Sequence, residues 1–393
     1  MNGLLEAVWQ DTVDPFVKIL EPVLAGQGSH GMPLRRGRPS GVVTRTGIVP
    51  ERPDTTLRKG GDHARADRRC SHEPGRQDAA MTLSGADVEP FRGELVAYCY
   101  RMVGSFHEAE DLAQETVLRA WKARERYDPA RASVRTWLYR IATNVCLTAL
   151  EGRARRPLPS GLGAPGDDPG APLTPAFDIP WLQPFPDARF DVDARAGLRL
   201  ALVAAMQTLP PRQRAVLVLR EVLEFTAAEV AGQLGTTVPA VNSALQRARA
   251  ALADAGESTG LAEVGEPDDP KVREVIERYM RAFERADVPA LVRLLTDDAV
   301  LEMPPVPLWY RGSRDYGLFM RRVFDLRGGG WRLSRLTANG QPALAAYAPE
   351  PGGGHRLHTL QVFTVTGDRI ARNVVFADPA VFEAFFDSSD LPR

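Results

Sequence analysis

Cysteine, net charge and long apolar runs are all scarce in this chain of 393 residues. The three cysteines, Cys70, Cys99 and Cys146, form no C-x-x-C pair. This argues against a disulfide framework and a cysteine-rich zinc site, and favours buried thiols in a reducing cytoplasm. No run of about 18 uncharged apolar residues occurs, so we expect no transmembrane helix. The formal net charge of −1 excludes nucleic-acid binding through an overall positive charge. If the protein binds nucleic acid, it does so through local basic patches or together with a partner.

The composition is otherwise that of a globular protein, with 44% hydrophobic and 25% charged residues, and the length suggests two or three domains. Residues 1–80 are the exception. From Met32 to Arg76 there are 11 basic and 5 acidic residues and few large apolar ones, which predicts a disordered basic N-terminal extension. Because a regular pattern begins at Met81, we interpret residues 1–80 as an over-extended gene start. A basic arm that binds DNA phosphates is the alternative.

Residues 81–156 have the pattern of a small all-α domain. Apolar residues recur at helical spacing around 95–103, 108–124 and 134–151, with turn signals between these segments. A Pro-rich acidic linker follows over residues 157–190. It holds more apolar residues than a flexible spacer needs, so we expect part of it to dock on the protein. These residues are Phe177, Ile179, Trp181, Leu182 and Phe185.

Residues 191–256 predict a second all-α domain. Thr226 and Glu229 have the spacing of a capping box at the start of a helix that ends at Gly235. A further helix through Leu252 completes a helix-turn-helix outline, whose second helix enters the major groove in DNA-binding proteins. The outward positions of that helix carry side chains that pair with base edges or phosphates. They are Pro239, Asn242, Ser243, Gln246, Arg247 and Arg249.

Beyond a linker over residues 257–267, residues 268–393 predict an α+β domain. A strongly periodic helix around 272–283 and a short helix after Asp287 come first. The pattern then changes to strands, and Asn339-Gly340 is a tight hairpin signal. The expected strands cover 299–303, 331–338, 341–347, 356–365 and 369–377.

Four sequence blocks together resemble the extracytoplasmic-function (ECF) sigma factors of the sigma-70 family. Ala109-Glu-Asp-Leu-Ala-Gln-Glu-Thr116 with Leu118-Arg-Ala-Trp121 is similar to region 2.2, and Arg135-Thr-Trp-Leu-Tyr-Arg-Ile-Ala-Thr-Asn144 to regions 2.3 and 2.4. Leu209-Pro-Pro-Arg-Gln-Arg-Ala-Val-Leu217 and Val241-Asn-Ser-Ala-Leu-Gln-Arg-Ala-Arg249 are similar to region 4. The blocks have the family's order and spacing. The resemblance implies a protein that binds the RNA polymerase core enzyme, directs it to promoter DNA and is not itself an enzyme.

The resemblance also implies roles for particular residues. An acidic helix face would dock on the polymerase clamp: Glu108, Asp111, Gln114 and Glu115. The minus-ten promoter element would be bound by a loop, a helix and a basic patch: Tyr127, Arg135, Trp137, Arg140, Asn144, Arg153, Arg155 and Arg156. The outward face of the second helix-turn-helix helix would bind the minus-thirty-five element. The alternatives are a merely solvated acidic face and a mainly structural Trp137.

The last domain resembles the SnoaL-like cone fold through Met303-Pro-Pro-Val-Pro-Leu-Trp-Tyr-Arg-Gly312 and Phe376-Ala-Asp-Pro379. The cone encloses a pocket, for which the candidates are Glu302, Trp309, His358 and Asp378. No paired acid–base constellation is visible, so we expect regulation or ligand sensing rather than catalysis, and no metal or other cofactor.

The alternatives are a SnoaL-like enzyme fused to a DNA-binding module and a plain helix-turn-helix repressor. The segment Ala109–Trp121 argues against the repressor, which needs no polymerase-docking face. No residue pattern identifies an anti-sigma partner or the ligand of the pocket.

Overall fold

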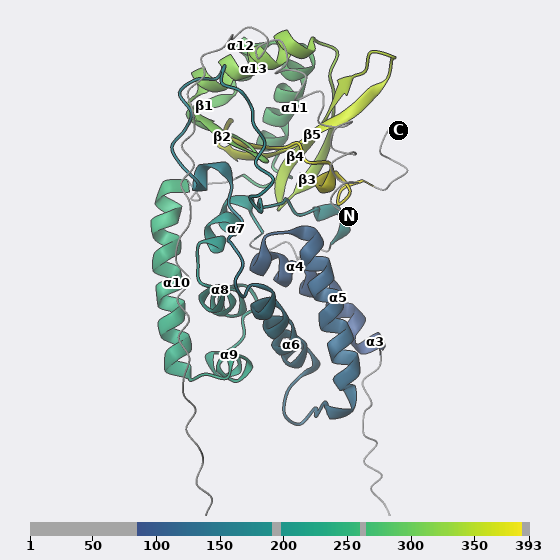
Figure 1. Ribbon diagram of the computed structural model, residues 1–393, viewed down its shortest axis with the longest axis vertical. Helices are drawn as coiled ribbons and strands as arrows, with labels where there is room; N and C mark the ends of the chain where they lie inside the picture. Colours follow the sequence, from purple (N-terminus) through teal and green to yellow (C-terminus); the bar gives the residue numbers. More distant parts are fainter. Residues whose placement is uncertain (1–84, 191–197, 260–264, 387–393) are drawn as a thin grey trace, which may run out of the picture. The chain divides into compact units, whose positions relative to one another are not determined.

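The computed structural model describes residues 85–190, 198–259 and 265–386 (Figure 1), all of which fall within a single contact unit. The extension expected over residues 1–80 lies outside these ranges, together with Cys70. The linker expected over residues 257–267 is described only at its two ends.

The first helical domain has the three helices that the sequence predicts. α4 ends where Gly104 adopts a left-handed conformation, with φ 72°. Ser105 then caps α5, and Ser133 caps α6, each by accepting a hydrogen bond from a backbone N–H of the first turn. The elements are α3 (Gly85–Val88), η1 (Glu89–Phe91), α4 (Arg92–Val103), α5 (Phe106–Ala123), η2 (Arg124–Arg126) and α6 (Val134–Ala149).

The core of this domain joins α4 to α6. The hydroxyl groups of Tyr98 and Thr143 are 2.7 Å apart, and both side chains are buried. Cys99 and Cys146 are free, fully buried thiols, as the sequence predicts for both. The hydrogen bond to Cys99 raises the pKa of the Cys146 thiol, as does burial, so this thiol stays protonated at neutral pH.

The linker contains two short 3-10 turns, η3 (Pro159–Gly161) and η4 (Asp187–Arg189), joined by loops and bends. The expected docking is confirmed for Leu182 and Phe185, whose side chains are completely buried. The ring of Phe185 packs against Tyr100 of α4, with 5.0 Å between ring centroids. Phe177, in contrast, is 57% exposed. Of the five apolar residues expected to dock, the two that are completely buried lie near the end of the linker that leads into the second helical domain.

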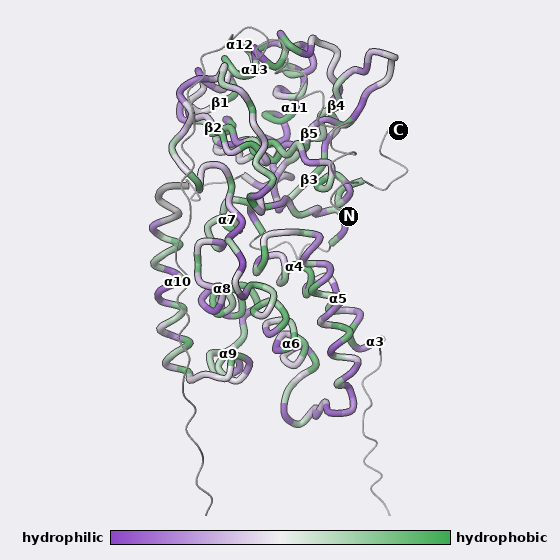
Figure 2. The backbone as a smooth tube through the Cα atoms, in the orientation of Figure 1, coloured by the Kyte–Doolittle hydropathy of each residue, from purple (hydrophilic) through white to green (hydrophobic). Residues whose placement is uncertain are grey.

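The second helical domain comprises α7 (Leu200–Gln207), α8 (Pro211–Leu217), the π-helical turn η6 (Val218–Val222), α9 (Ala227–Leu234) and α10 (Val238–Thr259). The predicted capping box is present, because Thr226 and Glu229 bond each other's backbone N–H groups. Hydrophilic and hydrophobic residues follow one another along α10 (Figure 2). One side of α10 therefore packs on α8 and α9 while the other stays exposed.

The C-terminal domain is a six-stranded sheet in the order β2-β1-β6-β5-β4-β3, with β1 and β6 parallel and the other pairs antiparallel. Helices α11 to α13 lie on one side of this sheet (Figure 1). The strands are β1 (Leu295–Met303), β2 (Val306–Arg311), β3 (Arg332–Ala338), β4 (Gln341–Pro349), β5 (His355–Thr366) and β6 (Arg369–Phe376). The helices are α11 (Pro270–Glu284), α12 (Val288–Arg293), α13 (Ser313–Arg327) and α14 (Pro379–Phe382).

The two faces of the sheet are buried in different apolar clusters. Along β4, Leu344 and Ala346 pack in the cluster beneath the helices, whereas Ala343 and Ala345 belong to a cluster that continues through both helical domains. Successive side chains of a strand point to opposite faces, so β4 is apolar at nearly every position. The C-terminal domain therefore shares a core with the helical domains.

Residues 306–327, for which no element is predicted from the sequence, form β2 and α13. Tyr316, Phe319, Met320 and Phe324 are buried at helical spacing. The helix has no capping side chain at Gly312, and its exposed positions are rich in arginine. Asp315 is the one acidic residue of its first turn, so the signal for the start of the helix was weak, although the apolar period was present in the sequence.

Candidate protein and nucleic-acid interfaces

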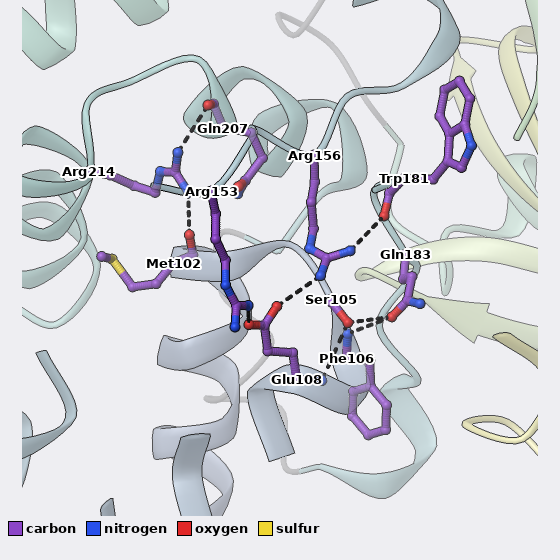
Figure 3. Close-up of polar contacts among 10 residues, drawn as sticks. All are labelled: Met102, Ser105, Phe106, Glu108, Arg153, Arg156, Trp181, Gln183, Gln207 and Arg214. Atoms are coloured by element: carbon purple, nitrogen blue, oxygen red, sulfur yellow. Dashed lines mark hydrogen bonds and ion pairs between the residues drawn. The ribbon is translucent and has the colours of Figure 1, made fainter. Parts of the chain in front are cut away.

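The acidic residues of α5 divide into two groups in the structure. Asp111 and Gln114 are exposed, and Glu115 forms an ion pair of 2.7 Å with Arg119 one turn later. Glu108 is 17% exposed and points to the segment after α6, where it pairs with Arg153 and Arg156 (Figure 3). The outward acidic face of α5 therefore consists of Asp111, Gln114 and Glu115.

The basic patch after α6 contacts the protein's own linker. Arg155 donates to the Gly161 carbonyl at 3.0 Å, and Arg156 donates to the Trp181 carbonyl at 3.4 Å. Burial and the nearby Arg153 lower the pKa of Arg156, whose charge is balanced by Glu108 at 2.9 Å. All three arginines thus have partners within the chain.

The residues predicted to bind the minus-ten element also divide into an exposed group and a half-buried group. Arg140 and Asn144 are exposed on the outer side of α6. Tyr127 and Trp137 are half-buried and stack on one another with 5.1 Å between ring centroids, and the Tyr127 hydroxyl donates to the Ala132 carbonyl. This pair fixes the loop before α6, which supports a structural part for Trp137.

Arg135 bridges the two helical domains. Its guanidinium donates to the Leu223 carbonyl at 3.2 Å and lies 4.7 Å from the ring centroid of Phe225. It also lies 3.5 Å from the carboxylate of Glu94. In this arrangement, the Arg135 side chain is bound to the second helical domain.

Arg214 of α8 forms a second bridge between the helical domains. It is 3% exposed and donates to the Met102 carbonyl of α4 (Figure 3). It also donates to the side chain of Gln207 and the carbonyls of Gln207 and Leu209. Burial lowers its pKa to about 10, so it remains charged at neutral pH. A buried cation with so many acceptors makes the contact between the domains specific.

The outward face of α10 is as the sequence predicts. Val241, Leu245 and Ala248 are buried against the domain, and the predicted base-contacting residues are all exposed: Pro239, Asn242, Ser243, Gln246, Arg247 and Arg249. Arg249 forms an ion pair of 2.7 Å with Glu221, whereas Gln246 and Arg247 are exposed on the same helix. A helix presenting amide and guanidinium groups in this way suits a major groove.

The C-terminal domain contains a cavity of about 420 Å³, hereafter the C-terminal cavity, bounded by β1, β5, β6, α11 and α13. Of the four predicted pocket residues, His358 lines it and the other three lie elsewhere. Burial and the charge of Arg327 lower the pKa of His358 to about 3, so its imidazole is uncharged at neutral pH.

The other three predicted pocket residues hold chain segments in place. Glu302 points away from the cavity because Leu301 and Met303, its neighbours on β1, point towards it; it pairs with Arg372 and accepts from the Ser160 N–H. The Trp309 indole donates to the Gly163 carbonyl of the linker. Asp378 caps α14. The prediction for Glu302 was wrong because the sequence does not show which residues of a strand point towards the cavity.

A polar cluster lines or adjoins the cavity and was missed by the sequence analysis. The hydroxyl groups of Tyr279 and Tyr316 are 3.0 Å apart, and the Tyr279 hydroxyl donates to Gln361. Asn373 donates to both Tyr316 and Gln361. Polar residues at buried, inward-facing strand positions are the signal that could have revealed it.

Neither a metal cluster nor a membrane span occurs in the described parts of the chain. No three His, Cys, Asp or Glu residues gather there in a way that could hold a metal ion. No helix among residues 85–190, 198–259 and 265–386 is long and apolar enough to cross a bilayer.

Comparison with known proteins agrees with this arrangement. The family descriptions "Sigma-70 region 2", "Sigma-70, region 4" and "SnoaL-like domain" match residues 88–156, 199–252 and 276–373. The ECF RNA polymerase sigma factor SigG of Mycobacterium tuberculosis is 45% identical over 355 residues, which cover 88% of this chain and 95% of SigG. The chain belongs to the ECF RNA polymerase sigma factors. Its SnoaL-like domain places it among sigma factors with this additional C-terminal domain.

A second relative supports the same architecture. The ECF sigma factor SigJ of Mycobacterium tuberculosis is 29% identical over 298 residues, covering 72% of this chain and 86% of SigJ. The SigJ crystal structure matches with a TM-score of 0.55 at 24% identity, over 77% of this chain and 99% of SigJ, which shows the shared fold. As a sigma factor, the protein acts with core RNA polymerase and promoter DNA in transcription initiation. The sigma-factor prediction is therefore favoured over the enzyme-fusion alternative.

Proposed function

We propose that this sigma factor binds core polymerase through the outer face of α5 and recognises promoter DNA through α6 and α10. The observation that carries the proposal is the exposure of three sets of polar side chains on separate helices. These are Asp111, Gln114 and the partly exposed Glu115 on α5, Arg140 and Asn144 on α6, and Gln246 and Arg247 on α10. In this proposal the polymerase catalyses phosphodiester bond formation, and the sigma factor acts in the cytoplasm, where polymerase and promoters are.

Charge reversal on α5 tests the polymerase face. Replacing Asp111 and Glu115 together by lysine should weaken binding to core polymerase at least tenfold, because repulsive charges at a complementary interface cost several kcal/mol. Binding would be measured by titrating core enzyme with labelled full-length protein. The matched control reverses two exposed charges of the C-terminal domain: Asp368→Lys in the β5–β6 turn and Glu277→Lys on α11. A folded double variant of α5 with unchanged core affinity would remove this assignment.

The two helical domains must separate for both promoter elements to be bound. The elements, named for positions minus ten and minus thirty-five, lie about 25 base pairs apart, or about 85 Å along B-DNA at 3.4 Å per base pair. Yet Arg135 of α6 lies within hydrogen-bonding distance of Leu223, and Arg214 contacts Met102. We therefore propose that the arrangement described here is a closed form of the sigma factor.

The hairpin between β3 and β4 supports a regulatory rather than catalytic part for the C-terminal domain. Its tip residue Asn339 is completely buried among the other parts of the chain. Its amide donates to the Tyr100 hydroxyl and the Leu198 carbonyl, and its side-chain oxygen accepts from the Phe185 N–H. The adjacent Gly340 N–H donates to the Asp187 carboxylate at 2.8 Å. One side chain thus ties together both helical domains and the linker, which favours the closed form.

Replacement of Asn339 by glycine tests this regulation. Glycine keeps the positive φ of 59° without strain and removes the side-chain hydrogen bonds. Leaving buried partners unsatisfied costs about 1–3 kcal/mol, which shifts a closed–open equilibrium roughly 5- to 150-fold towards the open form. We expect tighter core binding and more transcription at limiting polymerase. Asp368→Gly in the exposed β5–β6 turn is the control, and equal transcription by both variants would contradict the proposal.

A further inference from the structure

A second cavity of about 420 Å³, hereafter the junction cavity, lies where the two helical domains meet the linker. The first helical domain contributes the end of α4, the start of α5 and the segment after α6 to its lining. The second helical domain contributes residues of 207–214, and the linker contributes Pro180. A cavity of this volume admits a small molecule but not a DNA duplex, so its ligand differs from promoter DNA.

Positive charge dominates the lining of the junction cavity. The charged residues of the lining are one acid and four arginines: Glu108, Arg153, Arg155, Arg156 and Arg214. Glu108 divides its two carboxylate oxygens between Arg153 and Arg156 (Figure 3). Within the described residues, Arg155 and Arg214 bond to carbonyl and amide oxygens rather than to a carboxylate. The carboxylate of the lining therefore balances only part of its positive charge.

The arginines that follow α6 keep N–H donors for a further partner. A guanidinium has five N–H groups, and the exposed Arg155 uses one nitrogen to donate to the Gly161 carbonyl among the described residues. The side chain of Arg153 is 53% exposed. Planar guanidinium groups bind phosphate oxygens in pairs, so neighbouring arginines suit a ligand that carries several phosphate groups.

Arg214 contributes charge to the cavity rather than donors. It is 3% exposed, and its terminal nitrogens already donate to oxygens of the chain. Burial lowers its pKa to about 10, and burial together with the charge of Arg153 lowers the pKa of Arg156. Both shifts mean that the surroundings disfavour the cation, so an anion in the cavity would stabilise both charges.

We infer that the junction cavity binds a small anion with two or more phosphate groups, held chiefly by Arg153, Arg155 and Arg156. A nucleotide and a free polyphosphate share this chemistry. Because the lining comes from both helical domains, the bound anion favours the closed form and occupies arginines that could otherwise contact DNA. Binding at this site goes beyond the proposed function and is tested without polymerase or promoter.

Isothermal titration calorimetry of the full-length protein, in magnesium-free buffer at constant ionic strength, tests the ligand class. Sodium tripolyphosphate should bind with one-to-one stoichiometry and at least about tenfold more tightly than orthophosphate, because a further phosphate gains at least one charge-assisted hydrogen bond. Tighter binding of ATP than of tripolyphosphate would identify a nucleotide, and equal or weaker binding a free polyphosphate. Orthophosphate binding as tightly as tripolyphosphate, or no saturable binding of either polyphosphate, would overturn the inference.

Removal of two arginines tests the basic wall of the cavity. Arg153→Gln with Arg155→Gln should weaken tripolyphosphate binding at least about tenfold, through the loss of charge-assisted hydrogen bonds. Arg278→Gln with Arg281→Gln removes the same charge from exposed positions of α11 and should leave binding unchanged. An equal loss in both double variants would mean that the anion responds to overall charge, which contradicts a site in the cavity.

An added acid tests the opposite wall. Thr208 is an exposed residue of the second helical domain that lines the cavity, so Thr208→Glu should repel the anion and weaken binding at least about tenfold. Thr236→Glu makes the same change in the exposed turn before α10 and is the control. Undiminished binding by Thr208→Glu would place the anion on the first helical domain alone and overturn the inference. Because Thr208 is exposed, this variant decides even if the double arginine variant does not fold.

Discussion

Replacing Arg372 by methionine is expected to destabilise the C-terminal domain by about 3–5 kcal/mol, the cost of leaving a buried charge without its partner. Glu302 is completely buried on β1, and Arg372 of β6 pairs with it at 2.7 Å while only 12% exposed. The Ser160 N–H, which donates to the other carboxylate oxygen at 2.8 Å, would remain. One hydrogen bond does not offset the burial of a carboxylate.

Hydrogen exchange of the β1 and β6 amides in the full-length protein would measure this loss, because it reports on one domain of a multidomain chain. Glu302→Gln added to Arg372→Met removes the charge, keeps an acceptor for Ser160 and should recover most of the stability. The matched control is Arg332→Met, at an exposed position of β3, which should change the free energy of unfolding little. A loss below about 1 kcal/mol for Arg372→Met would mean that Glu302 is solvated rather than buried.

The second large effect concerns promoter recognition by α10. Replacing Arg247 by alanine should reduce discrimination between the preferred minus-thirty-five sequence and single-base variants by about 1–3 kcal/mol, the value of a good base contact. Gln246→Ala should do the same at a neighbouring position. Both side chains are exposed on the outer face of the helix, so neither change should disturb the domain's core.

The measurement compares transcription from a set of minus-thirty-five variants by polymerase saturated with each sigma variant. Arg278→Ala removes the same charge from exposed α11 and should leave discrimination unaltered. If Arg247→Ala weakens all promoters equally, the residue contacts phosphate rather than a base. Such a uniform loss would confine base recognition to the remaining outward residues.

Local signals account for most of the helical structure. The Thr226–Glu229 capping box and the cap at Ser105 act within one turn, and the apolar period of each helix marks its buried side. These interactions involve residues close in the chain, so a single sequence contains them. The exposed face of α10 was predictable for the same reason, since its buried residues define the opposite side.

Strands and their faces were less predictable because their environment is distant in sequence. Both faces of the sheet are buried, one beneath α11 to α13 and the other against the helical domains, so no alternation between apolar and polar residues marks the inward face. The pocket prediction consequently included Glu302, which points away from the cavity, and missed Asn373. A shift of one residue in a strand exchanges the two faces.

By itself, the sequence determined the identity of the protein as an ECF sigma factor, most of its helices and the hairpin at Asn339-Gly340, because motifs and capping are local. Only the tertiary structure decided what these parts contact. Glu108 meets Arg153 and Arg156 more than 40 residues away, and Asn339 joins segments 141 to 239 residues distant. Such pairs arise from packing of whole domains, whose burial removes water from both partners and makes each contact specific. No local pattern encodes that choice.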